Sequence, residues 1–229
     1  MEYLVAIIFG LLGCITGFFI PKASNQMIEI KLSQRQKHKE TNFLDQRKWA
    51  ILMTVGNGLL WGIIGYLAPS ILTGILICFL VTMAIMFTVI DMIIHIIPNE
   101  MLLVGLVLGI VFQLSTFGLK HFWIALACMT SIVVIFTIVG LIMGLNKIGA
   151  GDVKLAGLMG LILGYPLILY AILMMCVALI LYTVVGLSTG KMTHVTMFAF
   201  APFLMLGLVT GLALVLFPDF IGFVQTLKS

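Results

Sequence analysis

Two aspartates stand out because acidic side chains are scarce in this chain and costly inside a membrane. Away from a polar stretch near the N-terminus and from the chain ends, the acidic residues are Asp91, Glu100 and Asp152. An ionisable residue in or beside a membrane helix is a functional candidate. Two carboxylates held close together can share one proton, so that one acts as general base and the other as general acid. An aspartic dyad that hydrolyses a peptide bond needs this arrangement.

The composition predicts the elements that must position these acids. Of 229 residues, 62% are hydrophobic and 9% are charged, whereas a soluble domain carries roughly 25% charged residues. About 20 apolar residues cross the hydrocarbon core, and apolar runs without strand-like alternation must be helices there. We therefore expect an all-α membrane protein, a polytopic bundle of about eight transmembrane helices. The expected segments are Tyr3–Ile20, Trp49–Leu67, Ile71–Ile90, Met101–Phe117, Phe122–Gly144, Val153–Leu163, Pro166–Gly186 and Val195–Phe217.

One of these helices is expected to be short. A single helix from Val153 to Gly186 would be about 50 Å long, well beyond the ~30 Å core. Gly164-Tyr165-Pro166 offers a break. The piece before it, Val153–Leu163, is too short to span alone, so we expect a short helix that begins in a recess; a re-entrant segment is the alternative.

The basic residues predict the orientation. Seven of them fall in the expected loop from Pro21 to Lys48, and eight crossings place three more on the same side, against two on the other. The positive-inside rule then puts that loop and both aspartates at the cytoplasmic face. The ten inner residues are Lys22, Lys31, Arg35, Lys37, Lys39, Arg47, Lys48, Lys147, Lys154 and Lys191; the outer two are Lys120 and Lys228. We expect no partnership with nucleic acid, because the basic residues flank apolar runs.

The residues around the two acids form recognisable motifs. Asp152 stands in Gly149-Ala150-Gly151-Asp152-Val153-Lys154-Leu155, a Gly-x-Gly-Asp signature whose glycines would let another backbone approach the carboxylate closely. Asp91 follows Ile90, and Pro98 lies seven residues after it. A third segment, Phe198-Ala199-Phe200-Ala201-Pro202-Phe203, opens the last apolar run. Together these motifs resemble the type IV prepilin peptidases, which are Gly-x-Gly-Asp intramembrane aspartic peptidases.

The resemblance covers the chain from about residue 50 and implies a function. It implies an aspartic endopeptidase of the bacterial plasma or inner membrane that cuts the leader from prepilins or pseudopilins embedded in the bilayer, in pilus, secretion or DNA-uptake systems. Asp91 and Asp152 would be catalytic, and further residues would bind substrate or shape the site: Gly149, Gly151, Lys154, Pro98 and Pro202. Asn99 replaces the acid that is usual in the first motif.

The N-terminal part departs from the family pattern. Many members carry a cytoplasmic loop with two zinc-binding Cys-x-x-Cys pairs and also methylate the product, but Pro21 to Lys48 contains no cysteine. We therefore expect no metal and no cofactor, with S-adenosylmethionine needed only if methylation occurs. The division we expect is 1–48, the first helix with its basic loop, and 49–229, the peptidase core.

Several alternatives stay open at this stage. His95 could tune Asp91 or be an ordinary interfacial histidine, and Glu100 and Lys154 could pair with each other, hold substrate or have no role. A preflagellin-type peptidase would use the same chemistry. A small proton-coupled carrier could use both acids as a relay, but it would place them near the membrane midplane. The sequence does not assign which aspartate is the acid and which the base.

Overall fold

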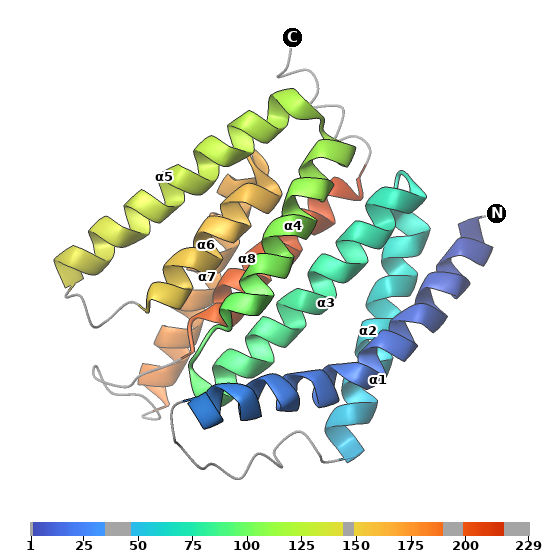
Figure 1. The fold of residues 1–229 in the computed structure, drawn as a ribbon, viewed down its shortest axis with the longest axis horizontal. Coiled ribbons are helices and arrows are strands. Elements are labelled where there is room, and N and C mark those ends of the chain that lie inside the picture. The colour runs from blue at the N-terminus through green and yellow to red at the C-terminus, as the bar shows by residue number, and fades with distance from the viewer. Residues whose placement is uncertain (1, 35–46, 144–148, 190–198, 218–229) are drawn as a thin grey trace.

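The computed structural model describes residues 2–34, 47–143, 149–189 and 199–217, and in these ranges the chain forms eight helices. Figure 1 shows how they are arranged, most of them tilted across the molecule. In chain order they are α1 (Glu2–Gln34), α2 (Arg47–Leu67), α3 (Ile71–Ile94), α4 (Asn99–Thr116), α5 (Leu119–Met143), α6 (Ala150–Leu163), α7 (Leu167–Ser188) and α8 (Ala201–Val215). The expected all-α polytopic bundle is confirmed.

Six of these helices are long and apolar enough to cross a membrane: α1, α2, α3, α4, α5 and α7. The chain is therefore a multi-pass membrane protein. The other two helices, α6 and α8, are shorter, with 14 and 15 residues. The break expected at Gly164-Tyr165-Pro166 is present, because α6 ends at Leu163 and α7 begins at Leu167. The part of the expected last segment from Val195 to Phe198 lies outside the described residues.

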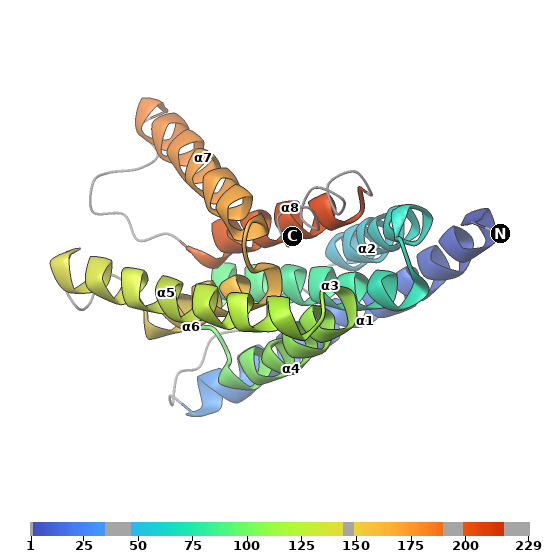
Figure 2. The same cartoon turned by 90° about the horizontal axis from the view of Figure 1, so that it is seen from above.

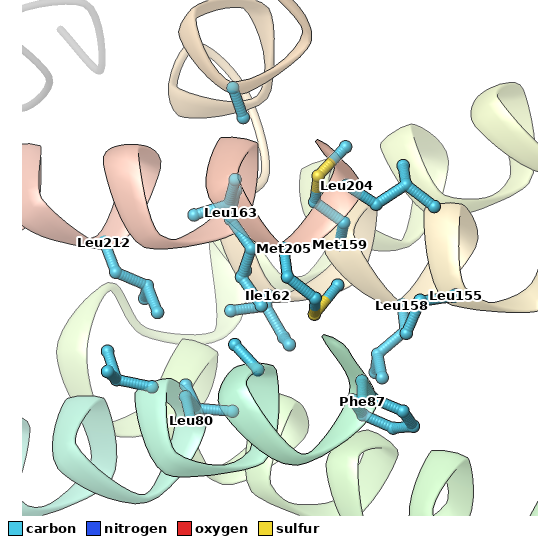
Figure 3. Close-up of a cluster of buried hydrophobic side chains, with 14 of the residues drawn as sticks. Leu80, Phe87, Leu155, Leu158, Met159, Ile162, Leu163, Leu204, Met205 and Leu212 are labelled. Atoms are coloured by element: carbon cyan, nitrogen blue, oxygen red, sulfur yellow. The ribbon is translucent and has the colours of Figure 1, made fainter. Parts of the chain in front are cut away.

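The short helix α6 lies at the centre of the bundle. Every residue from Leu155 to Leu163 is buried, and α6 packs against α4, α5, α7 and α8. Figure 3 shows its side chains meeting those of α3 and α8 in one apolar cluster, drawn with Leu80, Phe87, Leu155, Leu158, Met159, Ile162, Leu163, Leu204, Met205 and Leu212 labelled. Because lipid tails are as apolar as leucine, close packing rather than escape from water stabilises this contact.

The outer helices enclose this centre unequally. α5 packs on α6, and α1 and α2 pack on each other and on α3. α7 packs mainly on α8, and Figure 2 shows it leaving the plane in which α5, α6 and α4 lie. α6 is therefore covered closely by α5 and loosely by α7.

A buried polar network ties α1, α2 and α3 together. The Asn57 side chain is 1% exposed. Its Nδ2 donates to the Gly13 carbonyl and to Thr16 Oγ1, both at 2.9 Å, while Thr82 Oγ1 donates to its Oδ1 at 3.0 Å. Trp61 Nε1 donates in turn to Thr82 Oγ1 at 2.9 Å. Such interhelical hydrogen bonds hold helices together where the hydrophobic effect cannot.

The first helix is longer than the sequence indicates, so the expectation of a loop beginning at Pro21 is wrong. α1 runs through Pro21 to Gln34, and Figure 1 shows it bending and passing across the end of the bundle. Its second half is amphipathic, since Ile28 and Leu32 are buried while Lys31 Nζ binds Glu100 Oε1 at 2.7 Å. A proline inside a helix removes one hydrogen bond and bends the helix, and the contacts of this second half offset that loss.

Candidate active site

Asp91 lies in the last turn of α3, where the helix is about to end. His95 adopts the left-handed conformation with φ 50° and caps the helix, its N–H donating to the Asp91 carbonyl at 2.9 Å. The Asp91 side chain is 5% exposed. Its Oδ2 accepts a hydrogen bond from the backbone N–H of Ala201, 3.0 Å away at the start of α8. The carboxyl is thus enclosed between two helices that are far apart in the sequence.

Asp152 lies in the first turn of α6 and is half-buried. Gly149 is the N-cap residue of this helix, and the Asp152 N–H donates to its carbonyl at 2.9 Å. The position three residues after an N-cap suits an acid, because its carboxylate can reach back to the N-cap N–H and meets the positive end of the helix dipole. The Gly-x-Gly-Asp motif is therefore a helix start.

The fold brings the two aspartates together. α3 ends and α6 begins at the same end of the bundle (Figure 1). Asp152 lies on a helix too short to span a membrane, and burial together with the negative charge of Asp91 raises the pKa of Asp152 to about 6. The charge of His95 lowers the pKa of Asp152 and only partly offsets this rise. Two coupled carboxyls of this kind hold one proton between them over a range of pH.

The glycines of the motif make room for side chains of the protein itself. A Cβ on Gly149 would lie 3.0 Å from Asp152 Oδ2, and a Cβ on Gly151 would lie 3.1 Å from the Cβ of Ile97. Gly149 thus leaves space for the carboxyl, and Gly151 lets α6 approach the connection between α3 and α4.

The other residues singled out in the sequence surround this pair. Pro98 is the N-cap residue of α4. Lys154 Nζ donates to Asn99 Oδ1 at 3.1 Å, which joins the start of α6 to the start of α4. Glu100 pairs with Lys31 and not with Lys154. Pro202 is the second residue of α8, directly after the donor Ala201.

The sequence reasoning missed the roles of Ala201 and Lys31. The segment around Ala201 had a signal, because Pro202 is a residue type that belongs in a first helical turn. Lys31 had none, since it resembled the other basic residues of an expected loop. Within the described ranges, no three His, Cys, Asp or Glu side chains lie close enough to hold a metal ion. The four cysteines are free thiols on α1, α3, α5 and α7.

The geometry of Gly149 gives a first prediction. Gly149→Ala places its Cβ 3.0 Å from Asp152 Oδ2, so the carboxyl must shift by a few tenths of an ångström from its present position. The backbone angles of Gly149, φ −67° and ψ 137°, suit any residue, so we expect the melting temperature to stay nearly unchanged. Because a misplaced catalytic group slows a reaction, we expect the rate of the reaction that the two acids catalyse to fall about tenfold. Ala150→Ser, at the exposed neighbouring position, is the matched control. Equal rates for the two variants would contradict this role of Gly149.

Comparison with known proteins bears on the segment that carries both acids. Residues 77–184, just under half of the chain, match the model of the type IV leader peptidase family. We call residues 77–184 the leader peptidase segment. Among curated proteins and solved structures, no significant match to the chain was found.

The match confirms the resemblance seen in the sequence and supports a membrane-embedded peptidase. The leader peptidase segment contains α4, α5 and α6 in full, most of α3 and α7, and both aspartates. α1, α2 and α8 lie outside the segment. The Ala201 donor and the Lys31 ion pair are therefore contacts that the rest of the chain makes to the leader peptidase segment.

Proposed function

We propose that this protein is an aspartic endopeptidase that removes the leader of type IV prepilins or pseudopilins, with Asp91 and Asp152 as its catalytic dyad. The observation that carries the proposal is geometric: Asp91, in the last turn of α3, and Asp152, in the first turn of α6, lie at one end of the bundle. Both lie within the leader peptidase segment. One carboxylate takes a proton from the attacking water, and the other, protonated, gives a proton to the carbonyl oxygen of the substrate.

The position of the dyad supports a substrate that is part soluble and part embedded in the membrane. Asp91 lies in the last turn of a spanning helix, so water can reach the site from the adjacent face while an apolar helix remains in the lipid. A prepilin has this form, a short leader followed by an apolar helix. A carrier that relays protons would hold its acids nearer the midplane, which makes the location of Asp91 an argument for the peptidase.

The charges near the dyad support cleavage at the cytoplasmic face. The end of α1 and the starts of α2 and α6 lie on the same side of the bundle as the aspartates (Figure 1), and they carry Lys31, Arg47, Lys48 and Lys154. The start of α5, which carries Lys120, lies on the opposite side. Basic residues are retained on the cytoplasmic side of membrane proteins. A leader that has not been translocated would meet the dyad there.

Purified protein in lipid vesicles, incubated with a full-length prepilin, tests the proposal. We expect one cut immediately before the apolar helix, measured as the masses of the two products. The same masses reveal whether a methyl group is added to the new N-terminus when S-adenosylmethionine is supplied. The protein is incubated in the same way with a set of homologous prepilins and pseudopilins. If all of them stay intact after prolonged incubation, or if the cut falls within the apolar helix, the proposed function is wrong.

The acidity of the dyad gives a second prediction. An acid whose pKa is raised keeps its proton up to a higher pH, and the pKa of Asp152 is raised to about 6 by burial and by the charge of Asp91. The pair therefore holds its shared proton below about pH 6 and loses it above. We expect kcat/KM, which reports ionisations of the free enzyme, to fall as pH rises through this range. A flat profile from pH 5 to pH 9, measured with a soluble fluorogenic leader peptide, would contradict the shared proton.

A further inference from the structure

The start of α8 contacts Asp91 through a backbone N–H. Ala201 is the first residue of α8 and is 0% exposed. Its N–H donates to Asp91 Oδ2 at 3.0 Å in a buried setting. A hydrogen bond from a backbone N–H to a carboxylate stabilises the ionised form, and more strongly when the bond is shielded from water. The N-terminal end of the α8 dipole adds to this effect.

Two aromatic contacts hold the start of α8 in place. The ring of Phe200 lies 6.1 Å from that of Phe136 on α5, and the ring of Phe203 lies 5.2 Å from that of Tyr182 on α7, measured between centroids. Pro202, at the second position of the helix, fixes its own φ near the helical value and suits this position because it needs no N–H partner there. The direction of the Ala201 N–H is therefore set by packing on both sides.

The surroundings of Asp152 differ from those of Asp91. The N–H of Gly149 lowers the pKa of the Asp152 carboxyl, but burial and the charge of Asp91 raise this pKa by more. Asp152 is the more exposed of the two, which favours its charged form, but the buried N–H of Ala201 is bonded to Asp91 and not to Asp152. The charged groups that act on the pair are His95, which affects both carboxyls, and the two aspartates themselves; Lys154 on α6 is bonded to Asn99. When one proton is shared, Asp152 is the better place for it.

We propose that the backbone N–H of Ala201 is a positioning donor that keeps Asp91 ionised, so that Asp91 is the general base and Asp152 the proton donor. This assignment rests on the proposed function. Water attacks the peptide carbonyl carbon, Asp91 takes the water proton, and Asp152 gives its proton to the carbonyl oxygen, which leaves a neutral gem-diol. As the C–N bond breaks, Asp91 returns its proton to the nitrogen and Asp152 takes one from a hydroxyl. Both carboxyls end in their starting states.

Removal of the N–H at position 201 tests the assignment. Ala201→Pro lacks the donor, and proline is tolerated at the first residue of a helix; Ala201→Gly keeps the donor and is the matched control. A hydrogen bond to a charged group is worth about one pKa unit. We expect the acid limb of the kcat/KM profile to move up by about one pH unit in Ala201→Pro, kcat to fall about tenfold, and KM to stay within about twofold of the control.

The direction of the shift identifies the role of Asp91. If Asp91 were the proton donor, loss of the hydrogen bond would move the alkaline limb upward and leave the acid limb in place, and the assignment would be overturned. Identical profiles for Ala201→Pro and Ala201→Gly would overturn the positioning role itself.

A second variant guards against misfolding. Proline also restrains Phe200, the residue before it, so the same measurement is made with lactic acid in place of Ala201. This converts the amide to an ester, which removes the hydrogen and keeps the shape of the chain. An ester protein with the profile of the native protein overturns the proposal. If the native protein cuts no prepilin, or if cleavage survives replacement of Asp91, the proposed function fails instead, whatever position 201 does.

Discussion

Asp91→Asn and Asp152→Asn are each expected to abolish cleavage of a prepilin. An amide can neither take a proton from water at neutral pH nor return one, and general acid–base catalysis contributes roughly a hundred- to ten-thousandfold to rate. Because the two carboxyls act as one unit, either replacement should lower kcat by about a thousandfold, and the double variant should lose little more. Initial rates with purified protein in vesicles measure the effect.

A nearby acid outside the dyad provides the control. Glu100→Gln removes the negative charge from the pair with Lys31, in which Lys31 is 14% and Glu100 55% exposed, while the glutamine oxygen can still accept a hydrogen bond from Lys31. We expect cleavage within about twofold of the native rate. Melting temperatures of both Asn variants should stay at or above that of the native protein, since each loses an enclosed carboxylate but keeps its shape. An active Asp91→Asn or Asp152→Asn enzyme would remove the dyad from the mechanism.

Gly207→Ala is expected to cause the largest loss of stability among the substitutions considered. A Cβ at position 207 on α8 would lie 2.5 Å from the backbone oxygen of Ala171 on α7 and 3.2 Å from its carbonyl carbon. Backbone atoms cannot rotate away as the tip of a side chain can, so α7 and α8 must separate. Overpacking of this kind costs about 1–3 kcal/mol. Because α8 also carries the Ala201 donor, we expect activity to fall with stability.

The matched control for this substitution is Gly56→Ala on α2. A Cβ at position 56 would meet nothing within 4 Å, so the same chemical change occurs without a collision. Alanine is favoured over glycine in a helix interior by up to about 1 kcal/mol, and Gly56→Ala should therefore be neutral or stabilising. Thermal unfolding in one detergent compares the two variants. A Gly207→Ala protein as stable as Gly56→Ala would show that α7 and α8 can move apart freely.

Much of the fold follows from hydropathy, because lipid admits only backbone that satisfies its own hydrogen bonds. The apolar runs marked eight helices, and Gly164-Tyr165-Pro166 marked the end of the short one. The prediction of a loop was wrong for residues 21–34, because composition alone does not distinguish a solvated basic loop from a helix that crosses the bundle end. The spacing of Ile28 and Leu32 was a signal for a helix, but it becomes decisive only once α3 packs against α1 and the two side chains are buried.

The candidate site, like the fold, is determined in part by the sequence and in part only by the tertiary structure. The sequence by itself determined that Asp91 and Asp152 are functional candidates. A charged side chain in or beside a membrane helix is costly, and acids are therefore rare beside apolar runs. Only the tertiary structure decided what each carboxyl meets: the N–H of Ala201 for Asp91, and the space left by Gly149 for Asp152. Every residue except proline carries a backbone N–H, so the residue type does not indicate which N–H donates to a carboxyl. Its direction depends on how α8 is held between α5 and α7, and that is a property of the packed bundle.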